Sequence, residues 1–242
     1  MPKRCPAISI LLGLALGLAL AGCAAPPIQH KDGRSTARSY TLTNLAKSDV
    51  DLVSELVRAE AIEILRRISL KLYRRNPQEF RKAGLASAEE ASARIFADIE
   101  QWTPANPPPG RWEDRFHATF DENHSGDRVH AFMRGLTLMV LAAYEYRREF
   151  FLTDRLDPQK LYNSARNIET AVWKLGQARR GNGELFLLSN SLDGEPRNLS
   201  FEREFGKLIA TQDLIAIIIE DKSNRAITRL LHSTASFVFL PI

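Results

Sequence analysis

The sequence predicts an all-α protein whose folded part is a single multi-helix domain of about five to six helices. Apolar residues recur at the helical period in several long segments, and helix start and stop signals flank these segments. Segments with the alternating pattern of a β-strand are few and short. We therefore expect at most a short β-hairpin or a terminal strand beside the helices.

The first predicted helix covers residues 49–75, and Asn76-Pro77 ends it because the residue before a proline disfavours helical geometry. Its apolar face consists of Val53, Val57, Ala61, Ile64, Ile68 and Leu72. A second helix is predicted for residues 87–100, since Ser87-Ala88-Glu89-Glu90 has the pattern of a capping box.

The third predicted helix covers residues 126–147, with Ser125 as its N-cap. Residues 136–144 are apolar on nearly every side, which is typical of a buried central helix. The fourth begins at Asp157-Pro158, where proline occupies the first helical position, and Gly181-Asn182-Gly183 ends it.

After the fourth helix, residues 185–188 are predicted to form a short strand that turns at Asp193-Gly194. Two final helices are predicted over residues 200–220 and 223–235. Residues 237–240 are expected to be a buried terminal strand or an extended tail.

The N-terminus has the features of an export signal. Lys3 and Arg4 precede an apolar run over residues 7–21, which is short for a helix that spans a bilayer. The run ends in Leu20-Ala21-Gly22-Cys23, which resembles the lipobox of bacterial lipoproteins at every position. Small residues before the cysteine let a peptidase approach the backbone, and only a thiol accepts the lipid.

This resemblance implies that the signal peptide is removed before Cys23. The cysteine thiol would then carry a diacylglycerol and its amine would usually be acylated as well, with palmitate as a typical chain. Two or three acyl chains hold a protein at a membrane far more firmly than one. Residue 24 is alanine rather than aspartate, which in Gram-negative lipoproteins implies sorting to the outer membrane, facing the periplasm.

The predicted organisation is a signal peptide (1–22), a lipidated N-terminus with a flexible tether (23–48) and a helical domain (49–242). A coil of about 25 residues has a root-mean-square reach of roughly 25–30 Å. Cys5 would leave with the signal peptide and Cys23 would carry lipid, so the mature protein would have no disulfide.

The charge balance gives no argument for nucleic-acid binding. Without Lys3 and Arg4, the mature chain would carry 31 of the 33 basic residues against all 29 acidic ones, a net charge of about +2. No contiguous basic tract is present, whereas nucleic-acid-binding domains concentrate such residues.

The densest polar group in the sequence suggests a metal site. Imidazole and carboxylate side chains can bind zinc or a similar ion, but the spacing matches no tight zinc template. His117 and His124 are expected in a loop, with Asp127 and His130 at a helix start. The simpler alternative places Asp127 in the first turn, where the helix dipole favours a carboxylate, and leaves the histidines partly exposed. We therefore predict no metal and no cofactor, with these four residues as the weak candidates.

A second candidate is a ligand-binding face on the fourth helix. Its amide, guanidinium and aromatic groups could bind a sugar or a peptide. The face consists of Tyr162, Asn163, Arg166, Asn167 and Glu169, with Trp173 beyond them. The alternative is an ordinary amphipathic helix in which Arg166 and Glu169 form an i,i+3 ion pair and the aromatic residues lie at the edge of the core.

Trp102 and Trp112 flank the proline-rich segment 103–110. Tryptophan beside an extended, donor-poor chain is typical of a recognition surface. It is equally typical of a loop that packs on its own domain, and the sequence leaves both alternatives open.

The sequence holds no GxSxG, Walker or GxGxxG motif, so no catalytic residue is proposed. The stretch from Leu156 to Asn167 resembles uncharacterised proteobacterial envelope lipoproteins, and this resemblance implies no activity. We expect a non-enzymatic accessory or assembly-support lipoprotein that contacts another envelope protein, of which an accessory of a secretion system or transporter is a narrower form. The alternative is a ligand-binding or hydrolytic lipoprotein that acts on cell-wall or sugar fragments.

Overall fold

A computed structural model describes Ile28, residues 41–192 and residues 194–236, with side chains described as far as Arg225. The contacts within the chain divide it into two units, residues 1–45 and residues 46–242. The described part of the second unit, residues 46–236, is called the body below. Cys23 and the predicted terminal strand at 237–240 lie outside the described residues.

The prediction of an all-α fold is confirmed, because the described residues contain helices and isolated bridges but no strand. None of the described helices is both long and apolar enough to cross a membrane. The helices are η1 (Leu42–Ala46), α2 (Asp49–Arg75), α3 (Pro77–Lys82), α4 (Ala88–Ile95), η2 (Ile99–Gln101), α5 (Trp112–Thr119), α6 (Arg128–Ala143), α7 (Pro158–Gln177) and α8 (Ser200–Ser236).

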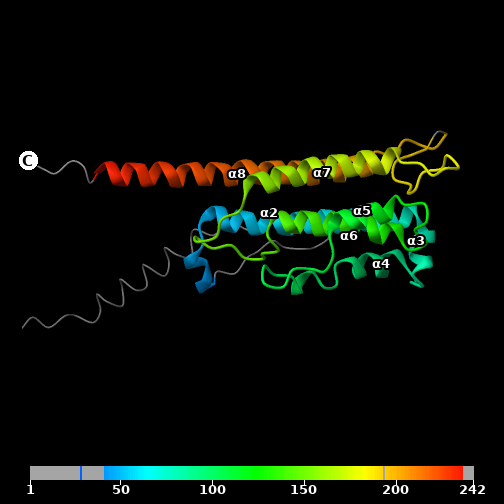
Figure 1. Ribbon diagram of the computed structural model, residues 1–242, viewed down its shortest axis with the longest axis horizontal. Helices are drawn as coiled ribbons and strands as arrows, with labels where there is room; N and C mark the ends of the chain where they lie inside the picture. Colours follow the sequence, from blue (N-terminus) through cyan, green and yellow to red (C-terminus); the bar gives the residue numbers. More distant parts are fainter. Residues whose placement is uncertain (1–27, 29–40, 193, 237–242) are drawn as a thin grey trace, which may run out of the picture. The chain divides into compact units, whose positions relative to one another are not determined.

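Helices α2 and α6 form the centre of the body (Figure 1). Helices α7 and α8 make an antiparallel hairpin that packs against them on one side, while α4 packs on another and α5 lies against α6. We call the end of the body where α2 begins the proximal end (residues 46–58, 144–158 and 212–225). The opposite end, where α2 ends, is the distal end (residues 72–86, 118–130 and 178–204). A helix of 27 residues separates them by about 40 Å.

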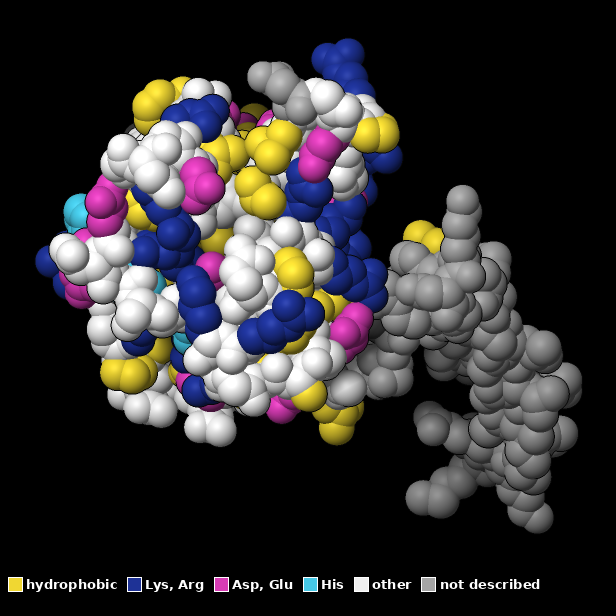
Figure 2. Space-filling view, turned by 90° about the vertical axis from the view of Figure 1, so that its right-hand side faces the viewer, with side chains coloured by type: hydrophobic (Ala, Val, Ile, Leu, Met, Phe, Trp, Pro, Cys, Tyr) yellow, Lys and Arg dark blue, Asp and Glu magenta, His cyan; other side chains and the backbone are white. Residues whose placement is uncertain are grey.

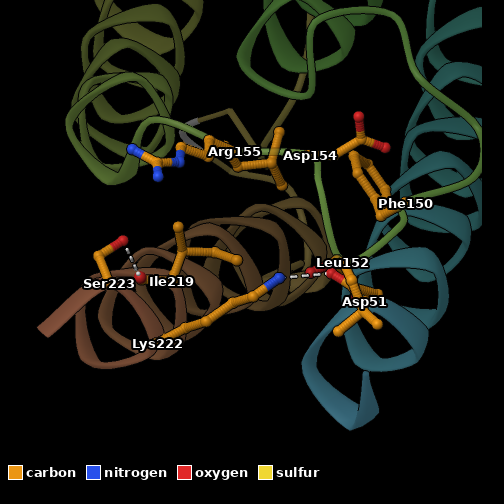
Figure 3. Close-up of a pocket in the computed structure, with 10 residues that line it drawn as sticks. Asp51, Phe150, Leu152, Asp154, Arg155, Ile219, Lys222 and Ser223 are labelled. Carbon is orange, nitrogen blue, oxygen red and sulfur yellow. Dashed lines mark hydrogen bonds and ion pairs between the residues drawn. The ribbon is translucent and has the colours of Figure 1, made fainter. Parts of the chain in front are cut away.

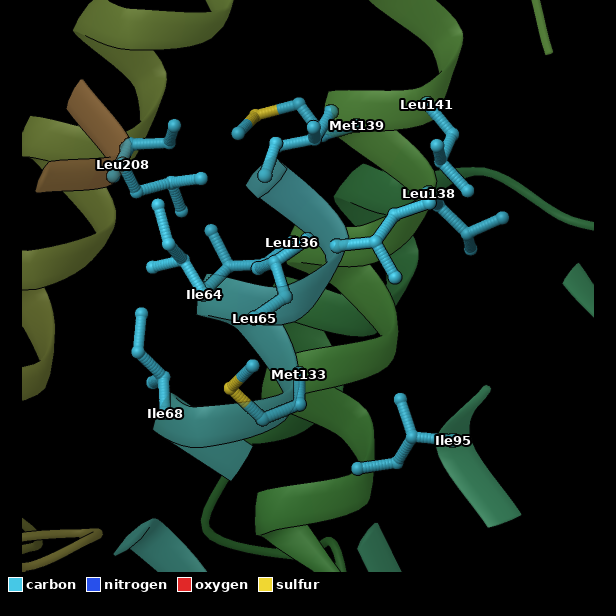
Figure 4. Close-up of a cluster of buried hydrophobic side chains, with 14 of the residues drawn as sticks. Ile64, Leu65, Ile68, Ile95, Met133, Leu136, Leu138, Met139, Leu141 and Leu208 are labelled. Atoms are coloured by element: carbon cyan, nitrogen blue, oxygen red, sulfur yellow. The ribbon is translucent and has the colours of Figure 1, made fainter. Parts of the chain in front are cut away.

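The core lies where α2, α4, α6 and α8 meet (Figure 4). Each helix contributes side chains that are almost fully buried, and burial of a large aliphatic side chain stabilises the fold by roughly 1.5–3 kcal/mol. The central members are Ile64, Leu65 and Ile68 of α2, Ile95 of α4, Met133, Leu136 and Met139 of α6, and Leu208 of α8. The apolar middle of α6 is therefore central, as its sequence predicts.

Two of the predicted helix starts are confirmed in detail. Ser48 caps α2 in a capping box, because its backbone N–H donates to Asp51 Oδ2 at 2.7 Å and Asp51 N–H donates to Ser48 Oγ at 3.3 Å. Asp157 caps α7, with Pro158 at the first helical position. The predicted bounds of α2, residues 49–75, agree with the structure.

Several predicted elements were wrong in detail. The second helix ends at Ile95 rather than at residue 100, and α6 begins after Asp127, which caps it in place of Ser125. The two predicted C-terminal helices are one helix, α8. Short helices α3 and α5 were not predicted, because each is under three turns and carries little periodic signal. Residues 185–188 do not form a strand.

Candidate functional site

A cavity of about 310 Å³ opens at the proximal end of the body and was not predicted from the sequence. The segment from Phe150 to Leu156 covers it, α8 forms its floor, and the first turns of α2 close one side (Figure 3). The walls combine apolar and charged side chains. The lining residues are Asp51, Ser54, Phe150, Leu152, Asp154, Arg155, Leu156, Ile219, Lys222 and Ser223.

The backbone bends sharply after α6 to form this cover. Glu145 and Tyr146 both have positive φ angles, 55° and 57°, a left-handed conformation that costs non-glycine residues roughly 1–2 kcal/mol each. Tyr146 N–H donates to Leu141 O at 2.9 Å, and the Tyr146 ring contacts Trp102 edge-on at 6.2 Å. These contacts hold the two residues in place, and the chain then turns back over the start of α2.

A partly buried ion pair joins α2 and α8 beside the cavity. Lys222 Nζ of α8 donates to Asp51 Oδ1 of α2 at 2.5 Å (Figure 3). Burial alone would raise the pKa of Asp51, but hydrogen bonds from Lys222 and Ser48 outweigh it and hold this pKa below its usual range. Asp51 is therefore ionised at neutral pH, and its negative charge faces the Lys222 ammonium.

The covering segment carries two neighbouring charged residues, Asp154 and Arg155, of which only Asp154 has an ion-pair partner among the described residues. Asp154 accepts from Arg147 at 2.9 Å and from Phe151 N–H at 3.0 Å, so its carboxylate already has partners. Arg155 is exposed, and no carboxylate of the described residues forms an ion pair with it. In Figure 3 its guanidinium extends over the floor of the cavity above Ser223.

Polar groups also occupy the buried face of the first half of α2. Ser54 donates to Val50 O at 2.7 Å, which leaves the hydroxyl lone pairs available. One turn further, Arg58 is only 6% exposed, and its Nε has no hydrogen-bond partner among the described residues. Burial, followed by the nearby positive charge of Arg148, lowers the pKa of Arg58 despite the nearby Glu100 and Tyr144. A buried guanidinium nitrogen without a hydrogen-bond partner costs free energy.

The predicted histidine cluster is only partly brought together. His124, Asp127 and His130 line a cavity of about 270 Å³ at the distal end, but His117 does not line it and lies exposed on α5 rather than in a loop. Asp127 is the N-cap of α6: its Oδ1 accepts from His130 N–H at 2.8 Å and its Oδ2 accepts from the Tyr73 hydroxyl at 2.8 Å. Asp127 thus has a structural role.

The charges around this cavity oppose cation binding. Lys82, Arg94 and Arg115 line it together with the histidines. Burial, followed by the positive charges of Arg134, Arg94 and Arg115, lowers the pKa of His130 to about 4. The described residues contain no group of three or more His, Cys, Asp or Glu side chains that could hold a metal ion.

The predicted face on α7 lies against α8 along a shallow groove of about 600 Å³. Arg166 donates to Asp213 of α8 at 2.6 Å and pairs with Glu169 at 3.2 Å, and its guanidinium lies 5.0 Å from the centre of the Tyr162 ring. Asn163 accepts from Gln159 at 2.8 Å, and Asn167 is half-buried. The guanidinium is therefore engaged within the hairpin. Tyr162 is 47% exposed and Trp173 66% exposed, so neither lies at the edge of the core.

The two tryptophans beside the proline-rich loop pack on the body. Trp102 is 4% exposed, and the Arg134 guanidinium lies 4.4 Å from the centre of its ring. Trp112 is half-buried and contacts Phe116 edge-on at 5.8 Å. The tryptophans at the two ends of the loop therefore pack on their own domain, while residues 104–107 and 109–110 between them are exposed.

The face of the distal end is rich in lysine and arginine (Figure 2). A groove of about 660 Å³ opens there between α3 and the 179–192 segment, with Lys82, Arg179 and Arg180 among its lining residues. Lys82 pairs with Glu79 at 2.7 Å, whereas Arg179 and Arg180 form no ion pair with the described carboxylates. The groove floor is apolar and includes Leu185, Phe186, Leu187 and Leu188.

Two arginines flank the ring of Phe186 in this floor. The Arg180 guanidinium lies 5.6 Å from the ring centre and that of Arg128 lies 5.1 Å from it. Burial, followed by the like charge of Arg180, lowers the pKa of Arg128. The positive charge of the distal face is thus concentrated and only partly compensated.

Comparison of the chain with protein-family models, with curated proteins and with solved structures found no match in any of the three.

Proposed function

We propose that this protein is a bacterial envelope lipoprotein, anchored through Cys23 and facing the periplasm from the outer membrane. It acts without catalysis, as an accessory that binds another envelope protein. The anchor is supported by the sequence: a cationic start, an apolar run and Leu20-Ala21-Gly22-Cys23 follow one another in the order of a lipoprotein signal.

The observation that carries the protein-binding role is the basic groove of the distal face. Arg179 and Arg180 form no ion pair with the described carboxylates and lie beside an apolar floor, in a groove whose lining has three basic residues and two acidic ones, Glu79 and Glu184. Charge complementarity steers association and selects the partner. We therefore infer a partner that presents an acidic segment. The groove also lies about 40 Å from the end where α2 begins and the tether joins the body.

Site-specific photo-cross-linking in cells tests this role. A photoreactive amino acid at Gln78, an exposed residue of the groove, should capture one reproducible envelope protein. The same amino acid at Thr153, exposed at the proximal end, is the matched control and should not capture it. Arg179→Glu should abolish the cross-link from Gln78. Equal capture from both positions, or none from Gln78 when the mature protein is abundant, would contradict the proposal.

The anchor has its own test. Cys23→Ser should leave an exported precursor with its signal peptide uncut and without lipid. Membrane flotation and metabolic labelling with palmitate measure both properties. A Cys23→Ser protein that is still cut and still floats with membranes would show that the lipobox interpretation is wrong.

A second candidate function is ligand binding, which the proximal cavity favours. Hydrolysis at the histidine cluster is not proposed, because His117 lies apart from His124 and Asp127, and Asp127 serves as a helix cap.

A further inference from the structure

The ten residues that line the proximal cavity are of two kinds: four are apolar, and six are polar or charged. Phe150, Leu156 and Ile219 are each less than 9% exposed and supply the apolar walls, with Leu152 at the rim. Apolar walls with a few placed polar groups are the usual composition of small-molecule sites. The buried apolar side chains can cover a short apolar chain and the polar ones can meet a polar head group, so the cavity fits a ligand that carries both.

The four charged residues of the lining, two acidic and two basic, carry no net charge but are not equally paired. Asp51 is neutralised by Lys222, and Asp154 by Arg147, which lies outside the lining. Arg155 is the lining charge without a carboxylate partner among the described residues. A guanidinium binds a carboxylate or a phosphate through two parallel hydrogen bonds, so its natural ligand is an anionic head group.

The position of Arg155 matches this role. Its guanidinium lies over the floor of the cavity, above Ser223, while the Asp51–Lys222 pair closes the other side (Figure 3). The Ser223 hydroxyl donates to Ile219 O at 3.0 Å, so its lone pairs stay available. An anionic head bound by Arg155 at the opening would direct an attached chain along Ile219, toward Phe150.

The volume limits the length of that chain. A cavity of about 310 Å³ corresponds to about ten water volumes at about 30 Å³ each, which is room for about ten non-hydrogen atoms. We propose that the cavity binds a small anionic amphiphile, an anionic head on a chain of about eight carbons, with the head on Arg155 and the chain between the covering segment and α8. This inference does not depend on a protein partner at the distal end.

Equilibrium dialysis of the full-length protein in a non-ionic detergent tests the inference. The detergent is present at the same concentration on both sides of the dialysis membrane. Its micelles then take up the same amount of ligand on each side, and any excess on the protein side is bound to protein. Radiolabelled octanoate should bind saturably, one molecule per chain, and octanol should bind at least about tenfold more weakly because it has no charge. Octyl phosphate in place of octanoate shows which head group is preferred, and saturable binding of either anion supports the site.

Three variants distinguish octanoate binding in this cavity from nonspecific binding of its apolar chain elsewhere on the protein. Arg155→Gln should weaken octanoate binding about tenfold or more, and Ser223→Leu should block it by filling the space under Arg155. Arg197→Gln removes an exposed arginine at the distal end and should leave binding unchanged. Urea unfolding midpoints equal to the wild type would show that each variant is folded. Equal binding of octanoate and octanol, octanoate binding unaffected by Arg155→Gln, or no saturable binding of either anion, would overturn the inference.

Discussion

The side-chain amide of Asn76 pairs with the backbone of Leu188 as a neighbouring strand would. Leu188 N–H donates to Asn76 Oδ1 and Asn76 Nδ2 donates to Leu188 O, both at 2.8 Å. The same Nδ2 donates to Leu72 O at 2.8 Å in the last turn of α2. Asn76 is fully buried, and its acceptor and both donors are satisfied. One side chain therefore attaches the 185–188 segment to the end of α2 and satisfies backbone groups that a sheet would otherwise pair.

Asn76→Ala should lower the free energy of unfolding by about 2–4 kcal/mol. Three hydrogen bonds are lost, and the Leu188 N–H and C=O groups are left without a partner in a largely buried position. Equilibrium urea unfolding measures this. Asn163→Ala, the same substitution at an exposed site on α7, is the control and should change stability by less than about 0.5 kcal/mol. Equal effects at the two positions would contradict the assigned role.

Arg128 organises the loop between α5 and α6. It is 2% exposed, and its guanidinium donates to Thr119 O at 2.8 Å, Asp121 O at 2.7 Å and His124 O at 2.7 Å. Arg128→Lys keeps the charge but cannot reach several carbonyl groups at once. We expect it to cost about 2–3 kcal/mol and to speed amide hydrogen exchange selectively in residues 118–124.

The control for this prediction is Arg115→Lys, since Arg115 is exposed on the neighbouring helix. It should change neither stability nor exchange in the loop. If Arg128→Lys speeds exchange uniformly across the body, its effect is on global stability alone and the local role is wrong.

Arg134 holds the segment that precedes the proline-rich loop, residues 95–102, to α6. It forms a bidentate pair with Asp98 at 2.7 and 2.6 Å, donates to Ile95 O at 2.6 Å and stacks on Trp102. Arg134→Lys should lose the fork geometry and the stacking, with a cost of about 1–2 kcal/mol. Acrylamide quenching of Trp102 fluorescence, in a protein whose other tryptophans are replaced by phenylalanine, should increase. If quenching equals that of the single-tryptophan protein that keeps Arg134, other contacts shield Trp102.

The helices that were predicted correctly are those with both a periodic apolar face and explicit caps. Ser48 and Asp157 each precede a long amphipathic segment, and the structure places caps at both. Helices α3 and α5 were missed because a helix of six or eight residues depends on tertiary packing more than on its own propensity. The expected strand at 185–188 was wrong because a buried side chain, Asn76, supplies the pairing, and sequence patterns cannot indicate such a distant partner.

The proximal cavity could not be predicted for a similar reason. Its charged residues come from separate parts of the chain, with Asp51 and Lys222 171 residues apart. One signal was available: Phe150-Phe151-Leu152 is apolar in a segment that connects two predicted helices, and such residues need a surface to cover. The histidine cluster shows the reverse: the sequence suggested a site that the fold does not assemble. His117 and His124 are close in sequence but face different surroundings.

His130 should make the protein less stable in mild acid. Its pKa in the folded state is about 4, from burial and from nearby arginines, whereas an unperturbed histidine has a pKa of about 6.5. The unfolded chain therefore binds a proton more readily between these values. The stabilisation present above pH 6.5 is lost as the pH falls toward 4. Because His130 is partly exposed, we expect a loss on the order of 1–2 kcal/mol.

Urea midpoints measured from pH 7.5 to pH 4.5 test this dependence, with His130→Gln and His117→Gln compared with the wild type. His130→Gln should flatten the decline, while His117→Gln, at an exposed position on α5, should leave it unchanged. The lowered pKa of Asp51 produces a separate loss of stability, which begins only below the unperturbed pKa of about 3.9, as the Asp51 carboxylate is protonated. A wild-type decline that persists in His130→Gln would assign the acid sensitivity to another group and contradict the lowered pKa of His130.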